Sequence, residues 1–219
     1  MALQGKLFKD ADVDPIGSGL LIPLRKKALK CKACPLEKTR TRVVFGEGNA
    51  NVPSVLFLGE SPGQAEDEQG RPFVGKAGQL LIKMVEAMGL QRGEVYLMNV
   101  VGCRTPDGRI PDPKEIQACG SICLGQIRAV KPRTIVALGL TAAAALMKES
   151  RGLSQLRGRW YTWEGIPVRV TYHPAYLLRP NATSFKKDAW DDLQAVSARL
   201  KGISDEARTE HGNRSPDRS

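Results

Sequence analysis

The sequence predicts an α/β protein, a three-layer α/β/α sandwich built around a mostly parallel central sheet. Short runs of apolar residues, each ending at a glycine or a polar residue, alternate along the chain with longer segments of helical periodicity. Uninterrupted apolar runs are typical of strands buried on both faces, and strands that alternate with helices form parallel sheets. The 219 residues are 42% apolar and 26% charged, which suits one folded domain with a proper core.

In the first half of the chain the pattern predicts two helices and two strands. Residues 23–30 predict a short basic helix, and residues 54–58 (SVLFL) predict a buried strand that ends at a glycine. Residues 76–88 predict an amphipathic helix, because their apolar side chains recur at helical spacing and a glycine follows. Residues 95–101 predict the next strand.

The second half of the chain repeats this alternation after a loop rich in Pro, Gly and Asp over residues 104–113. A helix over residues 114–130 and a third buried strand over residues 134–138 (TIVAL) follow. The remaining expected elements are an Ala-rich helix over 141–147, a hairpin of strands over 160–163 and 168–172, and a closing helix over 185–200.

The two ends of the chain lack this periodicity. We expect residues 1–20 to form a loosely ordered leader and residues 203–219 a disordered tail, which leaves 21–202 as a single domain. The N-terminus is too polar and acidic for a signal peptide, and no apolar run approaches the roughly 18 residues of a membrane helix. We therefore expect a soluble intracellular protein with no membrane partner.

The chain is strongly basic, with 33 Lys and Arg residues against 23 Asp and Glu residues and a net charge of +10. The last nineteen residues carry four basic and four acidic side chains, so the excess belongs to the folded body. A compact basic domain favours polyanionic partners such as nucleic acid or anionic membrane.

The five cysteines are an odd number, which does not suit a disulfide framework. Cys31 and Cys34 form a CxxC motif, which fits zinc, an iron–sulfur cluster, a redox pair or a coincidence. The motif follows a basic helical stretch and not a strand, which disfavours thioredoxin-like chemistry. Cys103 with either Cys119 or Cys123 would complete four thiolates; alternatively these three are small buried apolar residues.

Three segments lie at the ends of predicted strands: residues 59–63 (GESPG), 99–104 (NVVGCR) and 173–178 (HPAYLL). Ligands of open parallel sheets bind outside the carboxyl ends of the strands, so the chemistry is expected there. The first segment lacks the Lys-Ser/Thr end of a phosphate loop and the third glycine of a dinucleotide fingerprint, which disfavours a nucleotide cofactor.

These segments carry a specific resemblance. GESPG, the acidic pair Glu66 and Asp67, GRPFVGKAGQLL over residues 70–81, NVVGCR and HPAYLLR occur in the order of the signature motifs of the uracil-DNA glycosylase superfamily. With the cysteine spacing, they resemble its family 4, the iron–sulfur uracil-DNA glycosylases of bacteria and archaea. The resemblance implies the uracil-DNA glycosylase-like fold, a cytoplasmic location and a monomeric enzyme.

The resemblance implies hydrolysis of the N-glycosidic bond of deoxyuridine in single- or double-stranded DNA, after the nucleotide is flipped into a pocket. It assigns stacking on the uracil to Phe73, recognition of the uracil edge to Asn99, and a hydrogen bond to the 2-carbonyl to His173. Alternatively, Phe73 fills the apolar core, Asn99 caps the end of a strand, and His173 has a structural role.

The resemblance also offers Glu60 and Glu66 for positioning the attacking water and stabilising the cationic sugar, with Glu60 preferred. Either could instead pair with a nearby Lys or Arg. Ser61 departs from the family, which usually has a small apolar residue there. It could contact the water, widen the choice of substrate or hydrogen-bond the turn.

The segment after His173 is expected to be a loop that contacts DNA. Leu177 and Leu178 are the expected wedge that fills the gap left by the flipped base. Arg179, Lys186 and Lys187 are expected phosphate contacts, though a solvated face would explain them as well.

The cysteine frame resembles that of a [4Fe–4S] cluster held by Cys31, Cys34, Cys103 and Cys119, with a structural role because hydrolysis needs no electrons. Cys123 lies one helical turn from Cys119 and is left over, and an exchange of the two stays open.

Further departures and rival functions define what must be tested. Gly102 and Thr105 stand where the family more often has Lys and Pro, and residues 105–113 lack the inserted basic loop of a branch that cross-links to DNA. A glycosylase for hypoxanthine or xanthine and a non-catalytic iron–sulfur nucleic-acid-binding protein are the alternatives. The presence of Glu60, Asn99 and His173 speaks against the latter.

Overall fold

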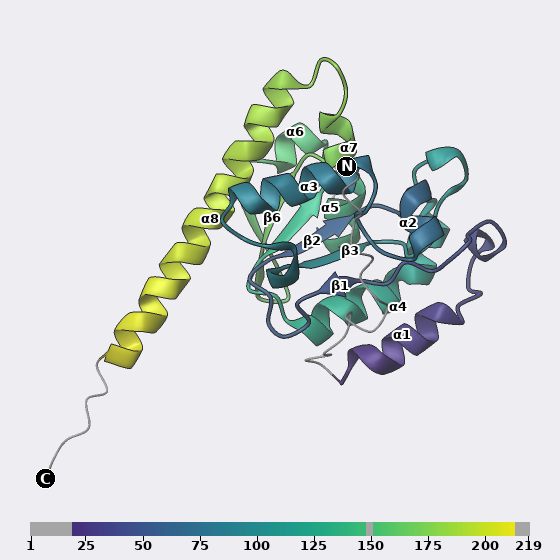
Figure 1. The fold of residues 1–219 in the computed structure, drawn as a ribbon, viewed down its shortest axis with the longest axis horizontal. Helices are drawn as coiled ribbons and strands as arrows, with labels where there is room; N and C mark the ends of the chain where they lie inside the picture. Colours follow the sequence, from purple (N-terminus) through teal and green to yellow (C-terminus); the bar gives the residue numbers. More distant parts are fainter. Residues whose placement is uncertain (1–18, 148–150, 213–219) are drawn as a thin grey trace, which may run out of the picture.

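The computed structural model describes residues 19–147 and 151–212, which form a central sheet with helices on both faces (Figure 1). The sheet has the order β1-β3-β2-β4-β6-β5. Its strands are β1 (Glu47–Gly48), β2 (Leu56–Gly59), β3 (Tyr96–Asn99), β4 (Ile135–Leu138), β5 (Trp160–Trp163) and β6 (Ile166–Thr171). The four central strands are parallel, and β1 and β5 are antiparallel edges. The predicted α/β fold with a mostly parallel sheet is confirmed.

The helices form two layers around this sheet. They are α1 (Leu21–Leu29), α2 (Gln64–Gln69), α3 (Lys76–Ala87), α4 (Pro113–Val130), α5 (Leu140–Met147), α6 (Leu153–Leu156), α7 (Pro174–Leu177) and α8 (Thr183–Gly212). One apolar cluster joins the sheet to α1, α4 and α5, and a second joins its other face to α3 and α8. In the part of the chain that is described, no helix is long and apolar enough to cross a membrane.

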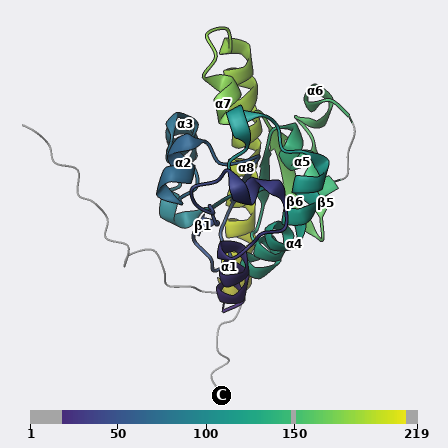
Figure 2. The same cartoon turned by 90° about the vertical axis from the view of Figure 1, so that its right-hand side faces the viewer.

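The central strands are buried along their whole length, as their apolar runs predict. All residues of β2, β3 and β4 are buried. In the parallel register Gly59 of β2 stands beside Asn99 of β3, and Leu138 of β4 stands beside Thr171 of β6. These strands therefore end at one common edge, which Figure 2 faces, with α7 above and α1 below.

The structure differs from the expected elements mainly where polar residues form short helices. α2 forms where no element was predicted, α7 replaces an expected loop, and α8 continues to Gly212, beyond the expected end at residue 200. Gly202 is a helix-stop signal at the expected end, but the helix runs through it, and residues 203–211 contain neither Pro nor Gly. Residues 1–18 of the expected leader and 213–219 of the expected tail lie outside the described residues.

A buried ionic network fixes α8 against the sheet. The carboxylate of Asp192 on α8 is fully buried and accepts hydrogen bonds from Nε of Arg169 on β6 at 3.0 Å and Nε of Arg157 at 3.2 Å. The backbone N–H of Gly158 donates to the same carboxylate at 3.1 Å. Since charge-assisted hydrogen bonds offset the desolvation of a buried carboxylate, this network is stable only when complete.

Removal of this carboxylate should destabilise the fold strongly. Asp192→Ala leaves the largely buried guanidinium of Arg169 without a carboxylate partner and leaves Arg157 with Asp188 alone, and we expect the free energy of unfolding to fall by about 3–5 kcal/mol. The exposed neighbour Asp191 provides a matched control. Asp191→Ala should change the free energy of unfolding by less than about 0.5 kcal/mol. Urea unfolding followed by circular dichroism measures both, and equal values would show that the network does not hold α8.

Candidate active site and cysteine cluster

The side chains of Phe73 and Asn99 meet over Gly59 at the common strand edge. A Cβ atom at position 59 would lie 2.3 Å from Oδ1 of Asn99 and 2.7 Å from Cζ of Phe73, so only glycine fits there. The two side chains are largely buried, with Phe73 5% and Asn99 8% exposed. The glycine that ends β2 therefore lets an aromatic ring and an amide lie side by side.

Phe73 has a left-handed backbone conformation, with φ +55°. This conformation is unfavourable for a residue with a Cβ atom and persists only where neighbours impose it. Gly78 on α3 is one such neighbour, since a Cβ atom there would lie 2.1 Å from the carbonyl carbon of Phe73. Arg92 is another, because its guanidinium donates to the carbonyl oxygens of Phe73 at 3.1 Å and Pro72 at 2.7 Å.

Two adjacent carboxylates on α2 hold the neighbouring loops. Oε1 of Glu66 accepts hydrogen bonds from the backbone N–H groups of Val74 at 3.1 Å and Gly75 at 2.9 Å. Asp67, 2% exposed, accepts from the N–H of Thr41 at 2.9 Å. Sequence reasoning offers Glu66 for the attacking water, but the structure shows its carboxylate fixing the turn that follows Phe73. The sequence predicts no role for Asp67.

His173 is a neutral hydrogen-bond donor at the same edge. Its Nδ1 accepts the backbone N–H of Ala175 at 3.2 Å, which leaves the ring proton on Nε2. Burial lowers the pKa of His173 to about 4, while the charge of Glu66 opposes this shift. The imidazole ring lies 6.4 Å from the Phe73 ring between centroids, with the two planes inclined by 29°.

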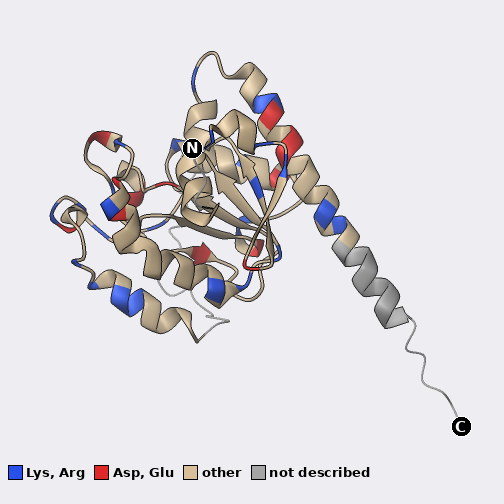
Figure 3. Cartoon of the chain, turned by 180° about the vertical axis from the view of Figure 1, so that it is seen from behind, with Lys and Arg blue, Asp and Glu red and all other residues tan. Residues whose placement is uncertain are grey.

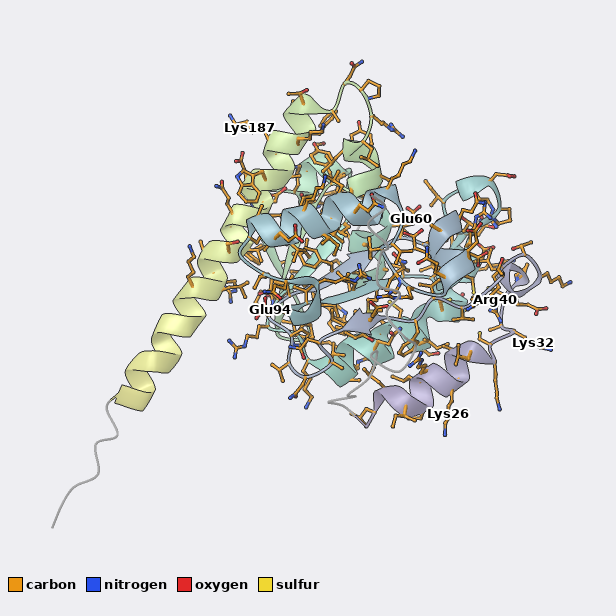
Figure 4. The ribbon with its side chains drawn as sticks, in the orientation of Figure 1. Lys26, Lys32, Arg40, Glu60, Glu94 and Lys187 are labelled. Atoms are coloured by element: carbon orange, nitrogen blue, oxygen red, sulfur yellow. The ribbon has the colours of Figure 1, made fainter. Side chains whose placement is uncertain are left out.

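Glu60, labelled in Figure 4, is held by a residue that the sequence did not reveal. The hydroxyl of Thr141 donates to Oε2 of Glu60 at 2.5 Å. Thr141 lies on α5, directly after the carboxyl end of β4, and a single hydroxyl in an Ala-rich helix gives no sequence signal. Gly139, with φ +88°, forms the turn between β4 and α5 and passes close to Cβ of His173. The fourth strand end thus also contributes to the site.

The segment after His173 begins with a helix and not with the expected loop. Leu177 ends α7 and is only 1% exposed, because its side chain packs against Tyr172 and Ala189. The prediction that Leu177 fills the gap left by a flipped base is therefore wrong. Its neighbour Leu178 is 49% exposed, and its side chain is accessible from the edge.

The remaining predicted contacts lie on the surface around the edge. Arg179 is exposed, and its guanidinium lies 4.6 Å from the centroid of the Tyr176 ring. Lys186 and Lys187, at the start of α8, are also exposed. Ser61 is half-buried in the bend between β2 and α2.

Four cysteines approach one another between α1, α4 and the segment after β3. Cys31, Cys103, Cys119 and Cys123 line one cavity between these segments. Cys34 lies close enough for its charge to raise the pKa of Cys103, although burial is the larger cause. Within the described residues, no group of three metal-ligating side chains is already arranged to hold a metal ion.

Hydrogen bonds and charge distinguish the two cysteines on α4. Burial raises the pKa of Cys119 to about 11, the backbone of Gly102 hydrogen-bonds its sulfur, and the charges of Cys31, Cys34 and Cys103 also act on it. The pKa of Cys123 is raised to about 12 by complete burial and by the charge of Cys119 alone. The charges of three other cysteines thus act on Cys119, whereas only the charge of Cys119 acts on Cys123.

Arg40 links two of the cysteine segments. Its Nη1 donates to Sγ of Cys103 at 3.1 Å, and its Nη2 donates to the carbonyl oxygen of Cys31 at 2.6 Å. Hydrogen bonds of this kind stabilise thiolate sulfur, so the surroundings suit cysteines that act as ligands.

The sequence profile of the Uracil DNA glycosylase superfamily matches residues 45–194. The chain belongs to this superfamily. The type-4 uracil-DNA glycosylase of Thermotoga maritima is 41% identical to it over 178 residues, which cover 80% of this chain and 92% of that protein. The type-4 uracil-DNA glycosylase of Pyrobaculum aerophilum is 44% identical over 168 residues, or 72% and 85% of the two chains.

A more distant relative supports the same assignment. The type-5 uracil-DNA glycosylase of Pyrobaculum aerophilum is 29% identical over 150 residues, which cover 61% of this chain and 65% of that protein. The predicted membership of the uracil-DNA glycosylase superfamily, in its type-4 branch, is confirmed by the higher identities of the type-4 relatives.

The protonation state of His173 in this superfamily member can be measured directly. We expect its imidazole to titrate near pH 4 in ¹⁵N NMR spectra, with the neutral form protonated on Nε2. Glu66→Gln should lower the pKa further, because the carboxylate charge favours the imidazolium. Since the unfolded chain binds this proton near pH 6.5, His173 should reduce the stability of the fold as the pH falls from about 6.5 to 4.

The His173→Gln variant assigns the signal and serves as the reference for the pH dependence of unfolding. Titration of His173 near its ordinary value of about 6.5 would contradict the assignment of a neutral ring at this edge.

Proposed function

We propose that the protein is a DNA-repair uracil-DNA glycosylase, which hydrolyses the N-glycosidic bond of deoxyuridine in DNA to release uracil and leave an abasic site. The observation that carries this proposal is the convergence of a buried aromatic ring, an amide and a neutral imidazole at one strand edge, in Phe73, Asn99 and His173. The names of the type-4 relatives support it. A base inside a duplex cannot reach this edge, so the nucleotide is extruded first.

Recognition of the base falls to Phe73 and Asn99. The ring of Phe73 stacks on the flipped uracil, and its imposed backbone conformation keeps the ring in place. The amide of Asn99 donates to the 4-carbonyl of uracil and accepts its N3–H. Cytosine has an amino group and an unprotonated nitrogen at these positions, so it would leave both amide groups unpaired in a buried site.

His173 assists departure of the base. Its Nε2–H donates to the 2-carbonyl of uracil, where negative charge develops as the glycosidic bond breaks. A neutral imidazole suffices for this task, because the hydrogen bond strengthens as charge accumulates on the oxygen. The hydrogen bond from Ala175 fixes the required tautomer before substrate binds.

Glu60 orients the attacking water and stabilises the positive charge that develops on the sugar. Thr141 binds one carboxylate oxygen, Oε2, and leaves Oε1 for the water. Glu66 acts indirectly, by fixing the turn after Phe73, and Ser61 shapes the bend beside Glu60. Hydrolysis thus requires one carboxylate near the sugar and one neutral group that donates a hydrogen bond to the base.

The outer rim of the site contacts the DNA. Leu178 replaces Leu177 as the side chain that fills the gap left by the extruded nucleotide, because only Leu178 is exposed. Arg179, Lys186 and Lys187 bind neighbouring phosphates. One chain supplies every group in this scheme, so we propose a monomer that acts in the cytoplasm of a bacterial or archaeal cell, with residues 21–202 as its domain.

The cysteine site suits a [4Fe–4S] cluster held by Cys31, Cys34, Cys103 and Cys119. Thiolates are the usual ligands of such clusters, and Cys31, Cys103 and Cys119 line one cavity, with Cys34 near enough for its charge to act on Cys103 and Cys119. Arg40 and Gly102 donate hydrogen bonds to two of the sulfurs. The cluster would be a structural cross-link between the segment after α1, the segment after β3 and α4. Hydrolysis of the glycosidic bond transfers no electrons, and no step of the reaction passes through this site.

The proposal is tested with duplex oligonucleotides that carry uracil, hypoxanthine or xanthine, followed by alkaline cleavage of abasic sites. We expect cleavage of the uracil duplex, and a loss of about 10²-fold or more in kcat for His173→Gln, since it removes a donor to developing charge. Asp191→Ala, an exposed change on α8, is the control and should retain full activity. Strand cleavage on none of the duplexes would indicate a binding protein, and preference for a purine lesion would reassign the substrate.

The cluster ligands are tested by a matched pair of substitutions on α4. Anaerobically purified protein should show broad absorbance near roughly 400 nm, which Cys119→Ser should abolish together with the bound iron. Cys123→Ser should retain both, because that sulfur is completely buried and only the charge of Cys119 acts on it. The reverse outcome would identify Cys123 as the fourth ligand, and colourless protein in all three preparations would refute the cluster.

A further inference from the structure

The segment that leads into and follows the first two cysteines concentrates the positive charge of the protein. We call residues 21–42, which comprise α1 and the loop that follows it, the basic lobe. It contains eight Lys and Arg residues and one Glu, which is seven of the ten net positive charges of the chain. In Figure 3, α1 is marked by basic residues without an acidic one. A tenth of the chain thus carries most of the charge imbalance.

Most of this charge is not used inside the molecule. Arg40 binds the cysteine segments, and Lys27 donates to the hydroxyl of Ser121 at 3.3 Å. Lys26, Lys30 and Lys32 are exposed and form no ion pair with any residue that the structure describes. Like charges four residues apart, such as Lys26 and Lys30, destabilise a helix. Their concentration therefore favours an external partner of opposite charge.

The lobe is held rigidly despite its charge. α1 packs on α4 through the buried side chains of Leu21 and Ala28. Gly125 on α4 permits this approach, because a Cβ atom there would lie 3.0 Å from Leu24. The apolar side of α1 faces the core, and its lysines face outward, as Lys26 does in Figure 4.

The basic lobe also lies on the side of the molecule that carries the proposed uracil-binding site of Phe73, Asn99 and His173. Figure 2 looks onto the common strand edge and shows α1 at its lower end and α7 at its upper end. Figure 4 shows Glu60 between these two ends, with Lys32 on the same side of the molecule. A duplex that presents a nucleotide to the site can extend from Arg179 near α7 toward the basic lobe.

We propose that the basic lobe is a second DNA contact, which binds backbone phosphates several nucleotides away from the extruded one. The choice of DNA as the polyanion rests on the proposed function. Lysine ammonium groups neutralise phosphates without reading sequence, so this contact supplies affinity for any duplex and leaves uracil recognition to the strand edge. The cysteine site would then also position a DNA-binding surface, since Cys31 and Cys34 lie within the lobe.

The salt dependence of binding tests the contact. The variant Lys26→Gln/Lys30→Gln/Lys32→Gln is compared with wild type on a uracil-free duplex of about 30 base pairs, by fluorescence anisotropy at several salt concentrations. Each lost phosphate contact lowers the slope of log Kd against log salt by about 0.9, so we expect a decrease of about 2 to 3. At low salt, Kd should rise about 10- to 100-fold.

The matched control removes three exposed charges outside the lobe. Lys83, Arg133 and Lys201 lie on α3, before β4 and on α8, and Arg133 stands at the opposite edge of the sheet. Lys83→Gln/Arg133→Gln/Lys201→Gln changes the net charge by the same amount and should leave the slope within about 0.5 of wild type. Equal slopes for the two triple variants would show that only net charge matters and would overturn the proposal.

Activity on substrates of two lengths separates this proposal from the proposed function. The lobe variant should cleave a uracil-containing single strand of about five nucleotides as wild type does, because such a strand does not reach the lobe. On the 30-base-pair uracil duplex its KM should rise about 10-fold or more, with kcat unchanged.

The remaining outcomes are equally decisive. Absence of cleavage by wild type would refute the glycosylase, while the salt slopes would still decide whether the lobe binds DNA. An unchanged slope on DNA, together with lost binding to RNA or to vesicles of anionic lipid, would assign the lobe to that other polyanion.

Discussion

Two adjacent buried carboxylates on α2 set the positions of the loops on either side of it. Buried charge is unfavourable unless it is hydrogen-bonded, and here the donors are backbone N–H groups of other segments. Glu66 holds the turn after Phe73, and Asp67 holds Thr41 at the end of the basic lobe. A six-residue helix is not stable alone. α2 therefore depends on these contacts, and the turn after Phe73 and the segment that carries Thr41 both depend on α2.

The backbone of Phe73 is held from its other side by the short edge strand β1. Burial raises the pKa of Glu47 on β1, but Arg71 and Arg92 lower it by more, so the carboxylate stays ionised. Glu47 accepts from Arg71 at 2.7 and 2.8 Å and pairs with Arg92 at 3.2 Å. Arg92 then reaches the carbonyl oxygen of Phe73. A strained residue of this kind costs about 1–3 kcal/mol, and such a chain of ionic contacts offsets that cost while keeping the ring aligned.

The sequence predicts those parts of the fold that depend on apolar periodicity. It does not predict the parts that polar contacts hold in place. The buried strands were predictable because parallel strands covered on both faces are continuously apolar. α2, with the sequence QAEDEQ, has no apolar face, so its carboxylate contacts could not be inferred. Pro174 suggested a loop but stands at the first position of α7, where proline is favoured, and His173 caps that helix. The strand-end motifs nevertheless predicted that Asn99 and Glu60 lie at the carboxyl ends of neighbouring strands, which is where the structure has them.

The segment from Asn99 to Cys103 explains why a cluster can matter in an enzyme that transfers no electrons. Its first residue ends β3 and bears the amide assigned to uracil, and its last lies at the cysteine site. Between them, the N–H groups of Val100 and Val101 donate to the carbonyl oxygens of Gly59 and Glu60. These five residues thus connect the amide of Asn99, the loop that carries Glu60 and the cysteine site. The Cys103 end of this segment is not held by a further strand, and a cross-link at Cys103 would restrict its motion. The cross-link would thereby keep Asn99 in register with Glu60.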